Sequence, residues 1–208
     1  MNSPLRRTHS KDSIPHLTDK SHGFPLRHCR AIETTEQRAC LEKNPGWFSA
    51  WEHAFNLLYD DVSSGFVDVC LSFLGPRGTG KTQAATLLAF EFDSAGFSAC
   101  YSTAFEFFLA IKSSFNSSTQ SEDDVLKRFL SPALLVLDEL QERGDTAFED
   151  RMLAYLIDRR YRDCKATILI ANLKPDAFAT ALGSSIMRRV NETGGVIEFL
   201  TPIQSAGI

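Results

Sequence analysis

The chain has 208 residues, of which 43% are hydrophobic and 23% are charged. This balance is typical of globular proteins and excludes a collagen-like, low-complexity or wholly disordered chain. The length predicts one domain, and five scattered cysteines without a C-x-x-C pair do not indicate a disulfide framework. The sequence has no apolar run long enough to span a membrane, and residues 1–30 lack the apolar stretch of a secretion signal. The expected location is therefore cytoplasmic, with no membrane partner.

The net charge of −4 is distributed unevenly along the chain. Residues 1–30 contain six Lys or Arg and two Asp, a net charge of +4, which leaves −8 for residues 31–208. We expect residues 1–22, which also contain prolines and several serines, to form a flexible basic arm. A solvated terminus is the simpler interpretation of this arm, and contact with nucleic acid or an acidic partner is the alternative.

The first half of the chain alternates between helical and extended patterns. Apolar residues at helical spacing predict a helix that begins at Trp47 and packs one face on the core, namely Trp47, Trp51, Phe55 and Leu58. A strand is expected over 67–74, followed by a glycine-rich turn and a helix over 82–92. A second strand at 98–102 precedes an apolar helix at 104–115, whose residues Phe105, Phe107, Phe108, Leu109 and Ile111 are expected mainly in the core. A polar loop is expected over 116–124.

The second half continues the same alternation. Residues 133–137 have no polar alternation, as expected for a strand that is buried on both faces of a parallel sheet. A helix with an apolar stripe from Phe148 to Ile157 follows, and then a buried strand at 166–171. A helix that ends at Gly183, a short helix at 184–190 and a strand at 195–199 complete the pattern. The alternation predicts an α/β fold, a doubly wound parallel sheet of five strands flanked by helices.

The turn after the first strand carries the strongest chemical signal in the sequence. It reads Gly75-Pro76-Arg77-Gly78-Thr79-Gly80-Lys81-Thr82 and matches the phosphate-binding loop pattern G-x-x-x-x-G-K-[ST] between a strand and a helix. Glycines let backbone N–H groups surround phosphate oxygens, Lys81 reaches the β and γ phosphates, and the Thr82 hydroxyl is a Mg²⁺ ligand. We expect these eight residues and the following Gln83 to bind ATP.

An acidic pair supplies the second half of such a site. Asp138 and Glu139 directly follow the buried strand at 133–137. Asp138 is expected to hold Mg²⁺, and Glu139 is expected to polarise the attacking water, which favours ATP hydrolysis over a kinase or GTPase reaction. The simpler interpretation of an Asp-Glu pair is a cap on the next helix. This alternative is less favoured because the same sequence contains a phosphate-binding loop.

Three further polar residues are candidate catalytic residues. Asn172 follows the strand at 166–171, and if that strand lies between the other two, its amide is beside the γ phosphate as a sensor of nucleotide state. A strand-ending turn residue is the alternative. Arg188 and Arg189 are candidates for stabilising transition-state charge, against the simpler interpretation as surface arginines.

With these motifs assembled, residues 23–199 resemble the AAA+ ATPases of the bacterial helicase-loader group (DnaC type) and the related IstB-type transposition helpers. Gly23-Phe24-Pro25-Leu26-Arg27 is similar to the family's linker ahead of the ATPase core, and residues 157–161 resemble its helix after the acidic motif. Residues 183–190 are similar to the last conserved box, in which the position of Arg189 is that of the arginine finger. Ser185 replaces the box's first arginine, and Arg188 replaces an acidic residue.

The resemblance implies a linker at 23–46, an AAA+ core at 47–200 and a tail at 201–208. It also implies an ATP-dependent helicase loader that is a homo-oligomer when active and binds single-stranded DNA and a replicative helicase. In this family an N-terminal extension usually contacts the helicase. The arm at 1–22 stands at the corresponding position in this sequence, ahead of the linker. The candidate DNA contacts are Lys112 and Phe115.

Two other functions stay open at this point. The chain could be an IstB-like ATPase that assists a transposase, with the same catalytic residues, or an ATP-dependent binding switch that does not hydrolyse ATP. A small-molecule kinase is disfavoured, since no arginine-rich substrate lid is apparent.

Overall fold

The computed structural model describes residues 22–32, 43–64, 68–115 and 121–202, and of residues 60–64 only the backbone. Its centre is one sheet of five parallel strands in the order β2-β3-β4-β1-β5. The strands are β1 (Cys70–Leu74), β2 (Ala99–Thr103), β3 (Leu134–Asp138), β4 (Ala166–Ala171) and β5 (Gly195–Glu198). The expected five-stranded parallel sheet is confirmed.

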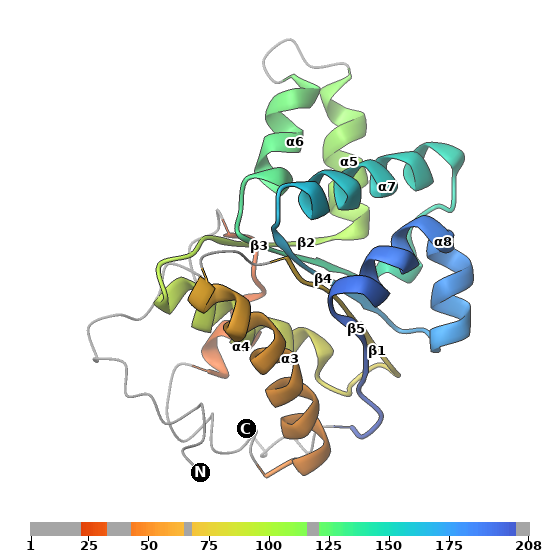
Figure 1. Ribbon diagram of the computed structural model, residues 1–208. Coiled ribbons are helices and arrows are strands. Elements are labelled where there is room, and N and C mark those ends of the chain that lie inside the picture. The colour runs from red at the N-terminus through yellow and green to blue at the C-terminus, as the bar shows by residue number, and fades with distance from the viewer. Residues whose placement is uncertain (1–21, 33–42, 65–67, 116–120, 203–208) are drawn as a thin grey trace.

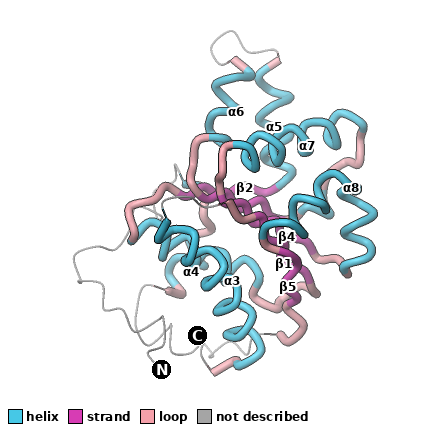
Figure 2. Tube along the Cα trace, viewed as in Figure 1, coloured by secondary structure: helices cyan, strands magenta, loops and turns pink. Residues whose placement is uncertain are grey.

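Helices cover both faces of this sheet and give three layers (Figures 1 and 2). One face carries α1 (Leu26–Arg30), α3 (Pro45–Ser64) and α4 (Lys81–Ser94), and the other carries α5 (Ala104–Ser114), α6 (Glu122–Leu130), α7 (Ala147–Arg162) and α8 (Pro175–Thr193). A 3₁₀ turn, η4 (Leu140–Glu142), follows β3. Within the described residues, no helix combines the length and apolarity needed to cross a bilayer.

The sheet order places the candidate site. Strand β4 lies between β3 and β1, with Leu74 opposite Ala171 and Leu137 opposite Leu169. The carboxyl ends of these parallel strands therefore meet at one edge of the sheet, where ligands bind in open α/β folds. The expected position of Asn172, after a strand between the other two, is confirmed.

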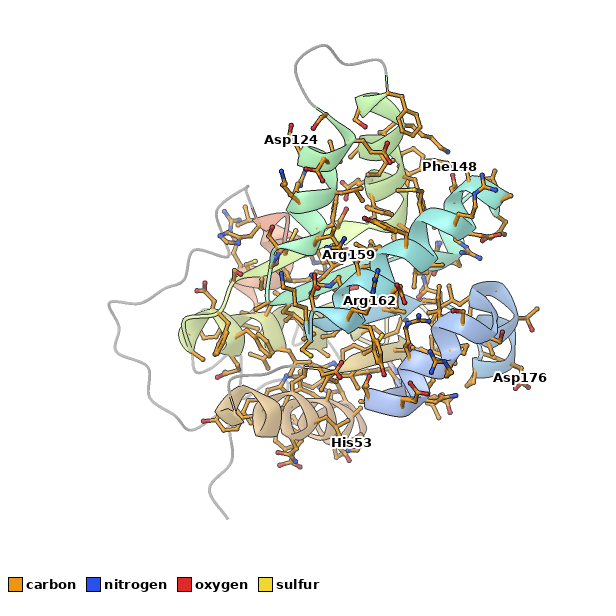
Figure 3. All side chains as sticks on the ribbon, turned by 45° about the horizontal axis from the view of Figure 1, so that its top comes forward. His53, Asp124, Phe148, Arg159, Arg162 and Asp176 are labelled. Atoms are coloured by element: carbon orange, nitrogen blue, oxygen red, sulfur yellow. The ribbon has the colours of Figure 1, made fainter. Side chains whose placement is uncertain are left out.

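The expected loop over 116–124 is wrong at its C-terminal end. Residues 116–120 lie outside the described residues, but helix α6 begins at Glu122 (Figure 3 labels Asp124 in its first turn). Ser121 and Asp124 form a capping box that stabilises this helix start. Val125, Leu126 and Phe129 then bury one face of α6, so a short amphipathic helix stands where polar composition suggested a loop.

Helix α5 corrects a second expectation. Phe107, Phe108 and Ile111 are buried as expected, but Phe105 and Leu109 are 60% and 51% exposed. The helix packs on the sheet along one stripe only, and these two side chains lie outside that stripe.

Other expectations agree with the structure, except that the strand expected over 67–74 begins at Cys70. The expected buried face of α3 is confirmed, because Trp47, Trp51, Phe55 and Leu58 are all buried. Gly183 interrupts α8 as expected, with φ 76° and ψ 167°, although the helix continues beyond Val190 to Thr193.

Arg160, on α7, is the largest charged side chain that is fully buried among the described residues. Its guanidinium donates hydrogen bonds to the carbonyl oxygens of Phe129 (2.8 Å), Pro132 (3.0 Å) and Ala166 (2.6 Å), and to the Thr167 hydroxyl (2.9 Å). These acceptors come from the end of α6, the start of β4 and the segment ahead of β3. Arg160 thus joins three segments of the fold through one planar group.

We expect Arg160→Ala to lower the free energy of unfolding by about 3–5 kcal/mol, because several buried carbonyl groups lose their donor at once. Urea denaturation measures this loss. The control is Arg159→Ala on the same helix, since the Arg159 side chain is 42% exposed and its ion pair with Asp163 is long, at 3.9 Å. Its effect should stay within about 0.5 kcal/mol. Equal effects of the two variants would show that Arg160 does not have this structural role.

Candidate nucleotide site

The loop between β1 and α4 has a backbone that only glycine tolerates at its key positions. Gly75 has φ 136°, and a Cβ there would lie 2.1 Å from the carbonyl oxygen of Phe199. Gly78 and Gly80 also adopt positive φ, at 80° and 82°. Gly80 caps α4 without a side-chain hydrogen bond, and the first turn has no acidic residue. The positive end of α4 is thus well suited to bind an anion.

Lys81 lies in the centre of this loop. Its ammonium group donates hydrogen bonds to the carbonyl oxygens of Gly75 (2.8 Å) and Pro76 (2.7 Å), and the Thr79 hydroxyl also donates to Pro76 (2.9 Å). Burial lowers the pKa of Lys81, and the charge of Asp138 opposes that shift. A buried cation beside a helix N-terminus provides the charge complementarity that a triphosphate requires.

The two sequence motifs meet at Thr82 and Asp138. The Thr82 hydroxyl donates to Oδ2 of Asp138 at 2.6 Å, although 56 positions separate them in sequence. Asp138 is 5% exposed, and its Oδ1 accepts the backbone N–H of Glu139 at 2.6 Å. A hydroxyl and a carboxylate at this distance fit Mg²⁺, which takes few protein ligands and completes its shell with phosphates and water. The donor set at this point fits MgATP.

Glu139 is exposed, whereas its neighbour Asp138 is buried. Its backbone adopts φ 56°, a left-handed conformation that is uncommon for a residue with a side chain. Partial burial, together with the charges of Asp138 and Glu142, raises the pKa of Glu139. A carboxylate of raised pKa is a better general base, and its exposure allows it to meet a water molecule.

Asn172 and Arg77 connect the site to the 3₁₀ turn η4. The backbone N–H of Asn172 donates to the side-chain oxygen of Gln141 at 2.9 Å. Arg77 pairs with Glu142 at 2.7 Å, and both side chains are exposed. The structure therefore brings the ends of β1, β3 and β4 together through contacts of η4.

Sequence reasoning missed the contacts between the N-terminal segments and the phosphate loop. Gln83 and His28 pair reciprocally: the Gln83 oxygen lies 2.8 Å from Nδ1 of His28, and the Gln83 amide donates to the His28 carbonyl at 3.2 Å. Trp47 donates its indole N–H to the Gly80 carbonyl at 3.0 Å. Trp47 was expected only as a core residue, and nothing in its apolar spacing indicates this polar contact.

The candidate fingers lie on α8, outside this cluster of residues. Arg189 forms an ion pair with Asp158, donates to the carbonyl oxygen of Ser185 at 2.7 Å and stands 5.6 Å from the Tyr161 ring centroid. Its side chain is 12% exposed. The Arg188 side chain is 60% exposed and pairs with Glu192 at 3.0 Å. Within the described residues, neither arginine forms a hydrogen bond or an ion pair with the phosphate loop of its own chain.

Comparison with known proteins identifies the family to which the chain is similar. Residues 62–190 match the model of a family described as IstB-like ATP binding protein. The uncharacterized protein YdaV of Escherichia coli (strain K12) is 29% identical over 136 residues, which cover 65% of this chain and 54% of YdaV. The replicative helicase loader DnaC of the same strain is 28% identical over 118 residues, covering 57% of this chain and 48% of DnaC. The chain thus spans about half the length of the curated relatives it matches.

The fold has a counterpart among solved structures. A crystal structure of the DnaC helicase loader aligns with a TM-score of 0.57 and 22% identity, covering 64% of this chain and 79% of that one. At this level of identity the likeness concerns the fold alone. The AAA+ type of P-loop fold expected from the sequence is confirmed.

Proposed function

Because this chain belongs to the family of IstB-like ATP-binding proteins, we propose that it binds ATP with Mg²⁺ and hydrolyses it to ADP and phosphate. The observation that carries the proposal is the 2.6 Å hydrogen bond from Thr82 to Asp138. It joins the phosphate loop to the acidic strand end, and both motifs are needed for a MgATP site.

Each residue of the site has a distinct role in this proposal. The loop 75–82 and the start of α4 bind the phosphates. The Lys81 ammonium group stabilises the negative charge that develops on the γ phosphate during the reaction. Thr82 and Asp138 hold Mg²⁺, which when bound neutralises charge on the phosphate oxygens. Glu139 orients and polarises a water molecule, and Asn172 senses the γ phosphate from the end of β4. Gln83 fixes the linker to α4 beside the bound nucleotide.

We expect Glu139→Gln to lower steady-state ATP hydrolysis at least 100-fold while ATP binding stays within about threefold of the wild type, because the variant loses the base but keeps the loop. Phosphate release and equilibrium binding of ATP measure the two quantities. Glu122→Gln, an exposed glutamate of α6, is the control and should change neither.

Two other outcomes would change the proposal. Wild-type protein that binds ATP but releases no phosphate, alone or with DNA, would favour the alternative of a binding switch without hydrolysis. Full turnover in Glu139→Gln would remove that residue from catalysis.

We further propose that the active form is a homo-oligomer in which Arg189 of one subunit acts on ATP bound to the next. Arg189 must then exchange its ion pair with Asp158 for the phosphate, and the small exposure of its side chain makes that exchange a conformational step. Arg188 is the alternative, since it is exposed and needs to leave only Glu192.

Mixing two inactive variants tests this arrangement. Arg189→Ala should lower turnover about 10³-fold. Adding Glu139→Gln subunits should restore part of it, because a mixed interface combines the intact Glu139 of one subunit with the intact Arg189 of the other. The opposite result would assign the finger to Arg188: Glu139→Gln subunits would then restore turnover to Arg188→Ala protein and would restore none to Arg189→Ala protein.

Single-stranded DNA is the proposed second ligand, with Phe115 and Lys112 as its contacts. The Phe115 side chain is 53% exposed and its ring centroid lies 5.8 Å from that of Phe148 on α7, which Figure 3 labels. Nζ of Lys112 lies 5.8 Å from the Phe148 ring centroid, but it also forms an ion pair with Oε1 of Glu149 at 2.6 Å. An exposed aromatic ring beside a cation is suited to base stacking, and the pairing of Lys112 with Glu149 reduces the charge available to the DNA backbone.

Helicase loading is the proposed cellular role, and assistance to a transposase is the second candidate. The DnaC relatives, named as replicative helicase loaders, support the first role. The second follows from the resemblance to IstB-type transposition helpers, which agrees with the match to the IstB-like family. The basic arm at 1–22 is proposed to contact the partner. Glu139→Gln protein loaded with ATP should retain a replicative helicase in a pull-down if the first role is correct, and retention of a transposase alone would favour the second.

A further inference from the structure

Tyr101 is a polar side chain in the centre of the site that the proposed chemistry does not use. It lies on β2, the edge strand beside β3, and is 7% exposed. Its hydroxyl donates to Oδ2 of Asp138 at 3.0 Å. This is the same oxygen that accepts the Thr82 hydroxyl.

The Asp138 carboxylate is therefore held by three donors. Two hydroxyl groups reach Oδ2 from β2 and α4, and the backbone N–H of Glu139 reaches Oδ1. A tyrosine hydroxyl carries its proton at neutral pH, so Tyr101 acts as a donor in this contact. With donors on both oxygens, the carboxylate plane has little freedom to rotate.

The N-terminal linker packs against the ring of Tyr101. Phe24 is buried, and its ring centroid lies 5.5 Å from that of Tyr101. Gly23 passes so close that a Cβ there would stand 2.3 Å from the Tyr101 carbonyl oxygen. His22 was expected at the end of the flexible arm, but its Nδ1 lies 2.9 Å from the carbonyl oxygen of Ala99, so it lies along β2 with the linker. The place of the Tyr101 ring, and through it the hydroxyl, thus depends on how the linker lies along β2.

We propose that Tyr101 is a positioning residue that orients Asp138 toward the metal of MgATP, and that the linker holds Tyr101 in place through Phe24. The inference rests on the proposed function of the site. A donor that fixes a metal-binding carboxylate typically changes metal affinity 10- to 100-fold. Because Tyr101 acts through Asp138, it should affect nucleotide binding only when the metal is present.

The experiment measures the affinity of a fluorescent ATP analogue in excess Mg²⁺ and, separately, in EDTA. Tyr101→Phe removes only the hydroxyl and keeps the ring on Phe24. It should weaken binding about tenfold in Mg²⁺ and less than twofold in EDTA. Ser102→Ala is the matched control, since it removes a neighbouring buried hydroxyl of β2 that donates at 3.0 Å to the Thr103 carbonyl; both affinities should stay unchanged.

Two more variants show whether the effect passes through Asp138. In an Asp138→Asn background, Tyr101→Phe should cause no further loss, because the carboxylate that it orients is gone. Phe24→Leu keeps the hydroxyl but loosens the ring, and should weaken Mg²⁺-dependent binding about threefold. This variant also tests the proposal should Tyr101→Phe fail to fold.

The alternative outcomes are distinct. An equal loss in Mg²⁺ and EDTA would make Tyr101 a structural residue only, and no loss in either would also overturn the proposal. Wild-type protein that binds the analogue under neither condition would instead refute the proposed function, and the role of Tyr101 with it.

Discussion

The hydrogen bond between Thr82 and Asp138 is the contact on which the rest of the site depends. It forms only if β1 and β3 end at the same edge of the sheet, and the insertion of β4 between them brings Asn172 to that edge as well. The sheet order is in turn maintained by strands that are buried on both faces and by helices that cover them. The buried Arg160 stabilises this arrangement by joining the end of α6 to the starts of β3 and β4.

The sequence predicts the parts of the fold that obey local rules. The phosphate loop is recognisable because glycine is needed where φ is positive, as at Gly75, and the buried strands because they lack polar alternation. Helix α6 was missed because its polar residues outnumber its apolar ones, and its capping box at Ser121 lies inside a segment of polar composition. The exposure of Phe105 could not be predicted either, because it depends on which stripe of α5 faces the sheet.

Long-range polar contacts are the part of the site that sequence reasoning could not supply. Tyr101 reaches Asp138 across 37 positions, and His28 reaches Gln83 across 55. No local pattern marks such pairs, because each depends on which strands and segments become neighbours. The contact of His28 joins the segment ahead of α3 to α4, whereas Phe24 reaches Asp138 only through the Tyr101 ring. Trp47 on α3 adds a contact with the Gly80 carbonyl. Phe24, His28 and helix α3 thus lie beside the residues of the candidate nucleotide site.

The central claim is that loop 75–82 binds ATP through Lys81 together with Thr82 and Asp138. Isothermal titration calorimetry of ATP in the presence of Mg²⁺, on wild-type protein and Lys81→Ala, tests it most directly. The account predicts saturable binding with one ATP per chain, and at least a 100-fold loss of affinity in the variant, because a buried cation against the phosphates is removed. Equal affinities for the two proteins, or no binding of ATP by the wild type, would contradict it.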